Sequence, residues 1–145
     1  MKIDMTLTFT AITAIVSLFL SIYMPLRLLH IDKKKRLDEQ LDAIIKISIQ
    51  YPYLESKKFT SEWVSDFDKE NEQYLRYDVY CNLLFNFLSR VASYYRYDNK
   101  KMEDYITIKD WIRYHKKCWQ DPTSPHENSD SYDKKFVDLI NNYIQ

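Results

Sequence analysis

The chain of 145 residues carries 21 basic and 21 acidic side chains, and it contains no glycine. Balanced charge excludes the overall polycation that is typical of nucleic-acid-binding domains, so we expect no direct nucleic-acid partner. The lack of glycine excludes P-loops, dinucleotide-binding turns and nucleophile elbows, because each needs glycine for close backbone approach or a sharp turn. Tight hairpins also depend on glycine, so the composition predicts an all-α fold.

The first element is an apolar segment at residues 5–26 that contains no charged side chain. Its length of about 22 residues exceeds the roughly 20 that a helix needs to cross a bilayer. A cleaved signal peptide would have a shorter apolar core, of about 7–15 residues, and a small-residue cleavage site. Neither feature fits this segment, so we expect an uncleaved transmembrane helix over residues 1–29.

Basic residues gather directly after this helix and predict its orientation. Lysine and arginine are retained on the cytoplasmic side of membranes, so we expect a single-pass protein of the cell inner membrane with its N-terminus outside and its C-terminal body in the cytosol. The cations also suit an anionic leaflet, at about 1 kcal/mol each, so lipid recognition is the alternative to a simple topology signal. The membrane-surface residues are Arg27, Lys33, Lys34, Lys35 and Arg36.

Hydroxyl side chains recur along one face of the predicted membrane helix. At about 100° per residue they fall within an arc of roughly 80°, and they are Thr6, Thr10, Thr13, Ser17 and Ser21. Three interpretations are open: the hydroxyls bond back to their own helix, or they let a second helix pack closely, or several copies line a water-filled pore. The last two need a partner helix, most simply another copy, and therefore predict a homo-oligomer with an oligomer or pore face.

The helical pattern continues beyond the membrane segment. Apolar residues at helical spacing run through residues 37–49, and Pro52 ends the pattern, because the residue before a proline avoids the helical region. We therefore predict a basic juxtamembrane and amphipathic helix over residues 30–50. Pro25 is the expected bend between this helix and the membrane segment.

The remaining residues, 51–145, suffice for one small domain, and we predict a compact cytosolic unit of three or four helices. Its strongest helix spans about residues 70–97 and is apolar nearly all round, which predicts a buried central helix. A polar break at residues 98–101 follows. Shorter helices are expected around Phe59 with Thr60 or Ser61 as cap, from a Thr107 cap to Trp119, and from Ser129 or Asp130 onward.

Three polar residues stack one turn apart along the predicted central helix: Asn82, Asn86 and Arg90. They could bind a small polar ligand, or they could form a satisfied hydrogen-bond network that fixes helix packing. The tryptophans likewise allow two interpretations, an aromatic core or an aromatic ligand cage.

His115 and Cys118 are three residues apart, a spacing that metal ligands use, and Cys81 and His126 would have to complete the set. Zinc sites usually show paired short spacings, and only one pair is present here. We therefore expect no metal and no cofactor. The cysteines should lie in the core as reduced thiols, and the histidine at the surface.

The sequence contains no obvious catalytic set, because no serine or cysteine has a base partner at a recognisable spacing. A helical RNase of the type common in bacterial immunity would need an arginine followed a few residues later by a histidine. The nearest pairs, Arg27 with His30 and Arg113 with His115, are too closely spaced. We therefore expect that the protein is not an enzyme.

Four stretches carry a resemblance: the anchor, YPYLE at 51–55, RYDVYCNLLFNFL at 76–88 and DWIRYHKKCWQDP at 110–122. Their layout resembles small bacterial membrane-anchored helical proteins of unknown function, and it is similar to membrane accessory proteins of RNA-targeting CRISPR systems. The second resemblance implies a role in antiviral defence and oligomeric pores. The chain departs from that group's arginine–histidine pattern, which counts against nuclease ancestry and leaves the membrane role untouched.

Two functional hypotheses follow. The first is a homo-oligomeric membrane effector or accessory protein of bacterial antiviral defence, in which hydroxyl faces meet around a seam or pore. The second is a membrane-tethered binding or sensing module that recruits a protein or small ligand and forms no pore. The expected partners are the lipid bilayer, further copies of the chain and a cytosolic signalling or defence protein.

Overall fold

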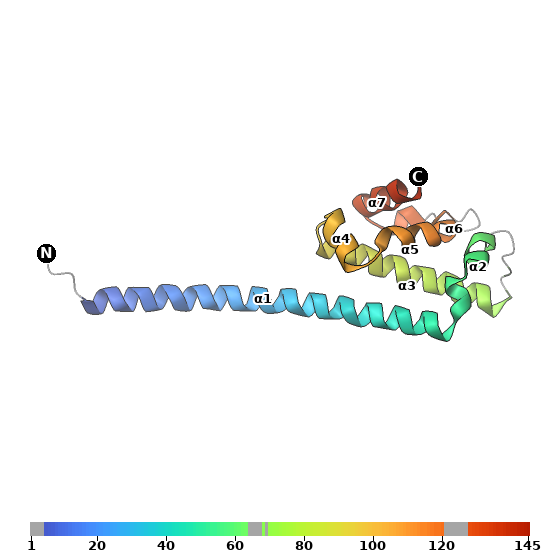
Figure 1. Cartoon of the computed structure of the whole chain (residues 1–145). Coiled ribbons are helices and arrows are strands. Elements are labelled where there is room, and N and C mark those ends of the chain that lie inside the picture. The colour runs from blue at the N-terminus through green and yellow to red at the C-terminus, as the bar shows by residue number, and fades with distance from the viewer. Residues whose placement is uncertain (1–4, 64–67, 69, 121–127) are drawn as a thin grey trace. The chain divides into compact units, whose positions relative to one another are not determined.

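The computed structural model describes residues 5–63, 68, 70–120 and 128–145, with side chains from residue 9 onward except at 128 and 129 (Figure 1). Every regular element in these ranges is a helix, which confirms the all-α prediction. The chain divides into two compact units, here called the N-terminal unit (Met1–Arg36) and the C-terminal unit (Leu37–Gln145).

The first helix, α1 (Met5–Gln50), covers both the predicted membrane segment and the predicted amphipathic helix. It stays helical through Pro25, which an apolar helix tolerates when the freed backbone groups find other partners. A bend at this proline stays a prediction. The helix ends where the sequence predicts, because Tyr51 precedes Pro52 and adopts φ −129° and ψ 73°.

The C-terminal unit contains more helices than the three or four expected. Helices α2 and α4 span only six and seven residues, too few to show an apolar periodicity in the sequence. The helix predicted from Thr107 to Trp119 is interrupted at His115, whose φ of −102° and ψ of 17° lie in the bridge region. The described elements after α1 are η1 (Pro52–Glu55), α2 (Lys57–Glu62), α3 (Glu72–Tyr94), α4 (Asn99–Tyr105), α5 (Ile108–Tyr114), α6 (Lys116–Trp119), η2 (Asn128–Ser131) and α7 (Lys134–Ile144).

Side-chain caps explain where two of the short helices begin. Ser56 caps α2 by accepting a hydrogen bond from the N–H of Phe59 at 3.5 Å, whereas the predicted caps Thr60 and Ser61 lie inside the helix. Asp98 caps α4 by accepting from a backbone N–H at 3.2 Å. The predicted polar break is therefore a helix start, because a capping aspartate looks like a loop residue in the sequence.

The caps of α5 and α7 also differ from expectation. Thr107 is the N-terminal cap position of α5, as predicted, but it makes no side-chain capping hydrogen bond. Ser129 and Asp130 belong to η2, and α7 starts later, where Asp133 accepts from the N–H of Phe136 at 3.0 Å. The last helix is thus shorter than predicted.

Helix α3 ends in a left-handed turn built without glycine. Arg96 and Tyr97 have φ of 55° and 61°, a region that costs roughly 1–2 kcal/mol for a non-glycine residue. The N–H of Tyr97 donates to the carbonyl of Ala92 at 2.8 Å, and its hydroxyl donates to the carboxylate of Asp133 at 2.9 Å. These contacts hold the turn and bring the end of α3 to the start of α7.

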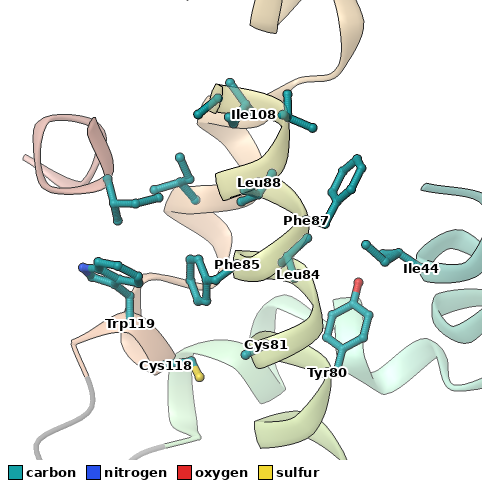
Figure 2. Close-up of a cluster of buried hydrophobic side chains, with 14 of the residues drawn as sticks. Ile44, Tyr80, Cys81, Leu84, Phe85, Phe87, Leu88, Ile108, Cys118 and Trp119 are labelled. Atoms are coloured by element: carbon teal, nitrogen blue, oxygen red, sulfur yellow. The ribbon is translucent and has the colours of Figure 1, made fainter. Parts of the chain in front are cut away.

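Helix α3 is central to the C-terminal unit, but only one of its faces is buried. Leu84 is fully buried, and Figure 2 shows it with Tyr80 on the side that faces Ile44 of α1. On the opposite face Leu75 and Val79 are 47% and 67% exposed. The prediction of a helix buried nearly all round is wrong, because the neighbouring helices cover only one side.

Aromatic rings fill much of the core. The ring centroid of Trp119 lies 5.0 Å from that of Phe85 and 6.0 Å from that of Phe136, and Figure 2 shows Trp119 beside Phe85. Trp63 is buried as well, and Trp111 is half-buried. Of the two interpretations of the tryptophans, the structure supports the aromatic core.

Candidate functional site

The N-terminal unit exposes an apolar surface. Every described side chain from Phe9 to Arg36 is exposed, and the large apolar ones include Phe9 at 73%, Ile15 at 68% and Leu18 at 63%. Among the described residues, α1 is the one helix long and apolar enough to cross a membrane. Its length and composition are therefore compatible with a single membrane span.

The hydroxyl face of this unit is also exposed, and two of its members bond within the helix. Thr13 Oγ1 donates to the carbonyl four residues earlier at 2.9 Å, and Ser21 Oγ does the same to Ser17 at 2.7 Å. These bonds match the first of the three interpretations, in which each hydroxyl donates a hydrogen bond to a backbone carbonyl of its own helix. Thr10 and Ser17 are exposed beside them, and the side chain of Thr6 lies outside the described residues.

The predicted membrane-surface residues form a cationic segment at the C-terminal end of the same unit. All of their side chains are exposed, so they can reach phosphate groups at a bilayer surface while their alkyl stems cover apolar area. They are Arg27, Lys33, Lys34, Lys35 and Arg36.

The three polar residues stacked on α3 do not lie in the core. Asn82, Asn86 and Arg90 are all exposed, on the face of α3 that none of the described helices covers. Their exposure does not support a hydrogen-bond network that fixes helix packing, because such a network needs a second packed surface. Ligand binding at this exposed face stays a prediction.

The C-terminal unit contains a buried polar cluster that the sequence does not predict. Its centre is His115, which is fully buried between α5 and α6 and not at the surface as expected. The Nδ1 atom lies 2.9 Å from the hydroxyl of Tyr77 in α3. The Nε2 atom faces a carboxylate oxygen of Glu55 in η1 at 3.4 Å. The imidazole is therefore bracketed by a hydroxyl and a carboxylate.

Glu55 joins several elements to this cluster. The hydroxyl of Tyr80 donates to its carboxylate, and Ser48 Oγ of α1 lies 2.9 Å from the same hydroxyl. The hydroxyl of Tyr114 in α5 donates to the backbone carbonyl of Glu55 at 2.6 Å. The Glu55–His115 cluster, defined as Ser48, Glu55, Tyr77, Tyr80 and His115, therefore connects α1, η1, α3 and the α5–α6 junction.

The environment fixes the protonation states of this cluster. Burial raises the pKa of Glu55, but the facing His115 and the hydroxyl of Tyr80 outweigh it, so the pKa lies below its usual 4.5. Burial, with the adjacent Cys81, raises the pKa of Tyr77, and burial with the bond to Glu55 raises that of Tyr80. At neutral pH the glutamate is thus an acceptor and both tyrosine hydroxyls are donors.

A carboxylate, an imidazole and a hydroxyl in series can orient and pass a proton. Here Tyr77 and His115 are completely buried, so a substrate cannot touch them in this conformation. Nε2 of His115 makes no hydrogen bond and only faces the Glu55 carboxylate, but the other bonds of this buried network fix the relative positions of the helices that it joins. The arrangement therefore supports a packing role.

Three of the four residues considered as metal ligands, Cys81, Cys118 and His115, lie in the described part of the chain. Within the described ranges, no group of three or more histidine, cysteine, aspartate or glutamate side chains could hold a metal ion. Cys81 and Cys118 are buried, as expected for core thiols. His126 lies outside the described residues.

Comparison with known proteins adds no further assignment. No protein-family model matches the chain, and the comparisons with curated proteins and with solved structures found no match either. The resemblance to small bacterial membrane-anchored proteins therefore stays a prediction, and function has to be inferred from the chain's own residues.

Proposed function

We propose that this chain is a single-pass membrane protein that tethers a small helical module to the cytosolic face of the membrane. One observation carries the proposal: the side chains from Phe9 to Ile31 are mostly apolar, and every one of them is exposed. Soluble monomers rarely expose apolar patches larger than a few hundred Å². Removing such side chains from water gains about 1.5–3 kcal/mol each, and a bilayer core supplies that environment.

The dimensions of α1 support a span. At 1.5 Å per residue, the uncharged stretch of residues 5–26 is about 33 Å long, close to the roughly 30 Å of a bilayer core. The hydroxyls of Thr13 and Ser21 are compatible with lipid, because each donates to a carbonyl of its own helix. The cations from Arg27 to Arg36 support an orientation with the C-terminal unit in the cytosol.

A charge-insertion experiment tests the span. We expect that Val16→Arg with Leu20→Arg, both in the apolar stretch, costs roughly 5–8 kcal/mol of insertion free energy and releases the full-length protein from membranes after alkaline extraction. The matched control is Ile45→Arg with Ile49→Arg, which likewise places two arginines at exposed apolar positions of α1, but beyond Arg36. Equal release of both variants, or of neither, would contradict the proposal.

A homo-oligomeric membrane effector is the second candidate, and the hydroxyl face favours it. Thr10, Thr13, Ser17 and Ser21 are exposed on one face, where small side chains would let the backbone of a second copy approach closely. Thr13 and Ser21 donate to their own helix, and a hydroxyl oxygen that donates can still accept a hydrogen bond.

Replacing Thr10, Thr13 and Ser17 together by leucine tests this candidate. If the face forms a seam or pore, the native mass of the detergent-solubilised protein falls from oligomer to monomer and dye leakage from vesicles is lost. Ile15→Leu with Ile22→Leu is the control, because it keeps the hydroxyl face intact. A wild-type monomer would remove this candidate, and leakage unchanged by the leucine substitutions would remove the pore.

A further inference from the structure

Helix α3 carries an exposed apolar ridge on the face that none of the described helices covers. Leu75, Val79 and Leu83 are 47%, 67% and 37% exposed, so the middle residue projects most. Their spacing of four residues places them along one i±4 row of the helix surface. Leu84 and Leu88, on the opposite side of α3, are fully buried. The ridge therefore belongs to a helix that the core already holds in place.

Polar and charged side chains frame this ridge. Asn82 and Asn86 lie beside it and are exposed. Glu72, in the first turn of α3, lies before it and Arg90 lies after it, and both are exposed. At about 100° per residue, these two charges fall within roughly 20° of Val79 around the helix axis. The face is therefore apolar in the middle, acidic at one end and basic at the other.

Such a face is complementary to a second copy of itself in the antiparallel orientation. When the i±4 rows of two helices interdigitate, the axes cross at about −50° and lie about 8–10 Å apart. With a two-fold axis at Val79, Leu75 of each copy meets Leu83 of the other.

The charges favour the same orientation. Antiparallel pairing brings Glu72 of one copy toward the turn of the other that holds Asn86 and Arg90, whereas parallel pairing would place like charges together. Glu72 already pairs with Arg76 of its own helix, but a carboxylate accepts several hydrogen bonds. The ends of the ridge therefore support self-association as well as its middle.

We propose that α3 is a homodimer interface, in which the ridge of Leu75, Val79 and Leu83 packs antiparallel against the same ridge of a second copy. Three partly exposed side chains per copy bury much less than the roughly 1,200–2,000 Å² of a stable interface. The ridge therefore needs a partner at high local concentration. Confinement of the copies to one membrane supplies that concentration without any new contact, so the inference rests on the proposed tether.

Cysteine cross-linking of the full-length protein in membranes tests the contact. In Val79→Cys the two facing Cα atoms would lie roughly 3.5–5.5 Å apart, from the spacing of the axes and the radius of a helix, which suits a disulfide. With copper phenanthroline as oxidant we expect a linked species of twice the monomer mass. Cys81 and Cys118 contribute little, because they are almost completely buried.

Ser93→Cys is the matched control. It also places a thiol at an exposed position of α3, but the two copies of this position would lie about 40 Å apart. We expect cross-linking of Val79→Cys to exceed that of Ser93→Cys at least severalfold. In the Val79→Cys background, Leu75→Glu should lower the linked fraction severalfold, and Leu75→Ile should retain it.

Mixed copies test the orientation. Leu75→Cys expressed together with Leu83→Cys should form the linked pair, and each variant alone should form severalfold less, because like positions would lie more than about 10 Å apart. Linkage of Leu75→Cys to itself, without linkage to Leu83→Cys, would overturn the antiparallel arrangement.

The interface is overturned if Val79→Cys forms no linked species, if Ser93→Cys links equally, or if the linked species is not twice the monomer mass. Failure of the tether gives a different result, which is recovery of the wild type in the soluble fraction. The Val79→Cys assay on purified protein at increasing concentration then decides the interface. A linked dimer that grows with concentration supports the ridge, and its absence at every concentration overturns it.

Discussion

Replacing Glu55 by glutamine tests the Glu55–His115 cluster most sharply. The substitution keeps the shape of the side chain and removes the negative charge that faces Nε2 of His115 at 3.4 Å and accepts from the hydroxyl of Tyr80. A hydrogen bond to a charged group contributes about 1.5–3 kcal/mol and a neutral one about 0.5–1.5. The weaker hydrogen bond from Tyr80 and the lost charge opposite His115, reduced because the carboxylate is 28% exposed, together predict a decrease of about 2 kcal/mol in the free energy of unfolding.

Urea unfolding followed by tryptophan fluorescence measures this change. Trp63, Trp111 and Trp119 all lie in the C-terminal unit, so the signal reports that unit and not the apolar part of α1. Glu70→Gln is the matched control, because Glu70 is an exposed glutamate and such substitutions usually change stability by less than about 0.5 kcal/mol. Equal stability of the two variants would refute the structural role of the cluster.

The same variant predicts a pH dependence. The folded pKa of Glu55 is lowered, so its contribution is fully present above the usual value of 4.5 and disappears as the pH falls through the folded pKa. The difference in unfolding free energy between the wild type and Glu55→Gln should therefore be constant from pH 6 to pH 8, an interval about two units wide, and shrink in acid. A difference that grows as the pH falls would contradict this assignment.

Two further predictions concern the backbone turn and the aromatic core. Arg96→Gly should stabilise the C-terminal unit by roughly 0.5–1 kcal/mol, because Arg96 has φ 55°, whereas Arg90→Gly inside α3 should destabilise it by about 1 kcal/mol; destabilisation by both changes would contradict the strained turn. Trp119→Ala should cost about 3–5 kcal/mol, because Trp119 packs against Phe85 and Phe136, and a loss below about 1 kcal/mol would be typical of a surface residue.

The parts of the fold that depend on local pattern are those that the sequence predicts. The uncharged stretch before Arg27 and the stop at Pro52 define α1 correctly, because hydropathy and proline sterics act over neighbouring residues. Helix α3 follows from its dense apolar positions. The exposure of one α3 face could not be predicted, because Leu75 and Val79 are apolar and yet lie on the side that none of the described helices covers.

The buried cluster could not be predicted in the same way. Glu55 and His115 are distant in the sequence, and His115 stands among charged neighbours that are typical of a surface helix. The one available signal is the abundance of tyrosine, with 13 in the chain, since a buried tyrosine hydroxyl needs a partner. That signal predicts buried acceptors without identifying them, because identification depends on how η1, α3 and the α5–α6 junction meet.

The central claim is that the N-terminal part of α1 crosses the membrane once, with the C-terminal unit in the cytosol. Labelling of single introduced cysteines with a membrane-impermeant maleimide tests it, and the native thiols interfere little because they are almost completely buried. The proposal predicts that Lys2→Cys is labelled in intact spheroplasts and that Ser61→Cys, at an exposed position of α2, is labelled only after lysis. Labelling of Ser61→Cys in intact spheroplasts, or recovery of the protein in the soluble fraction, would contradict it.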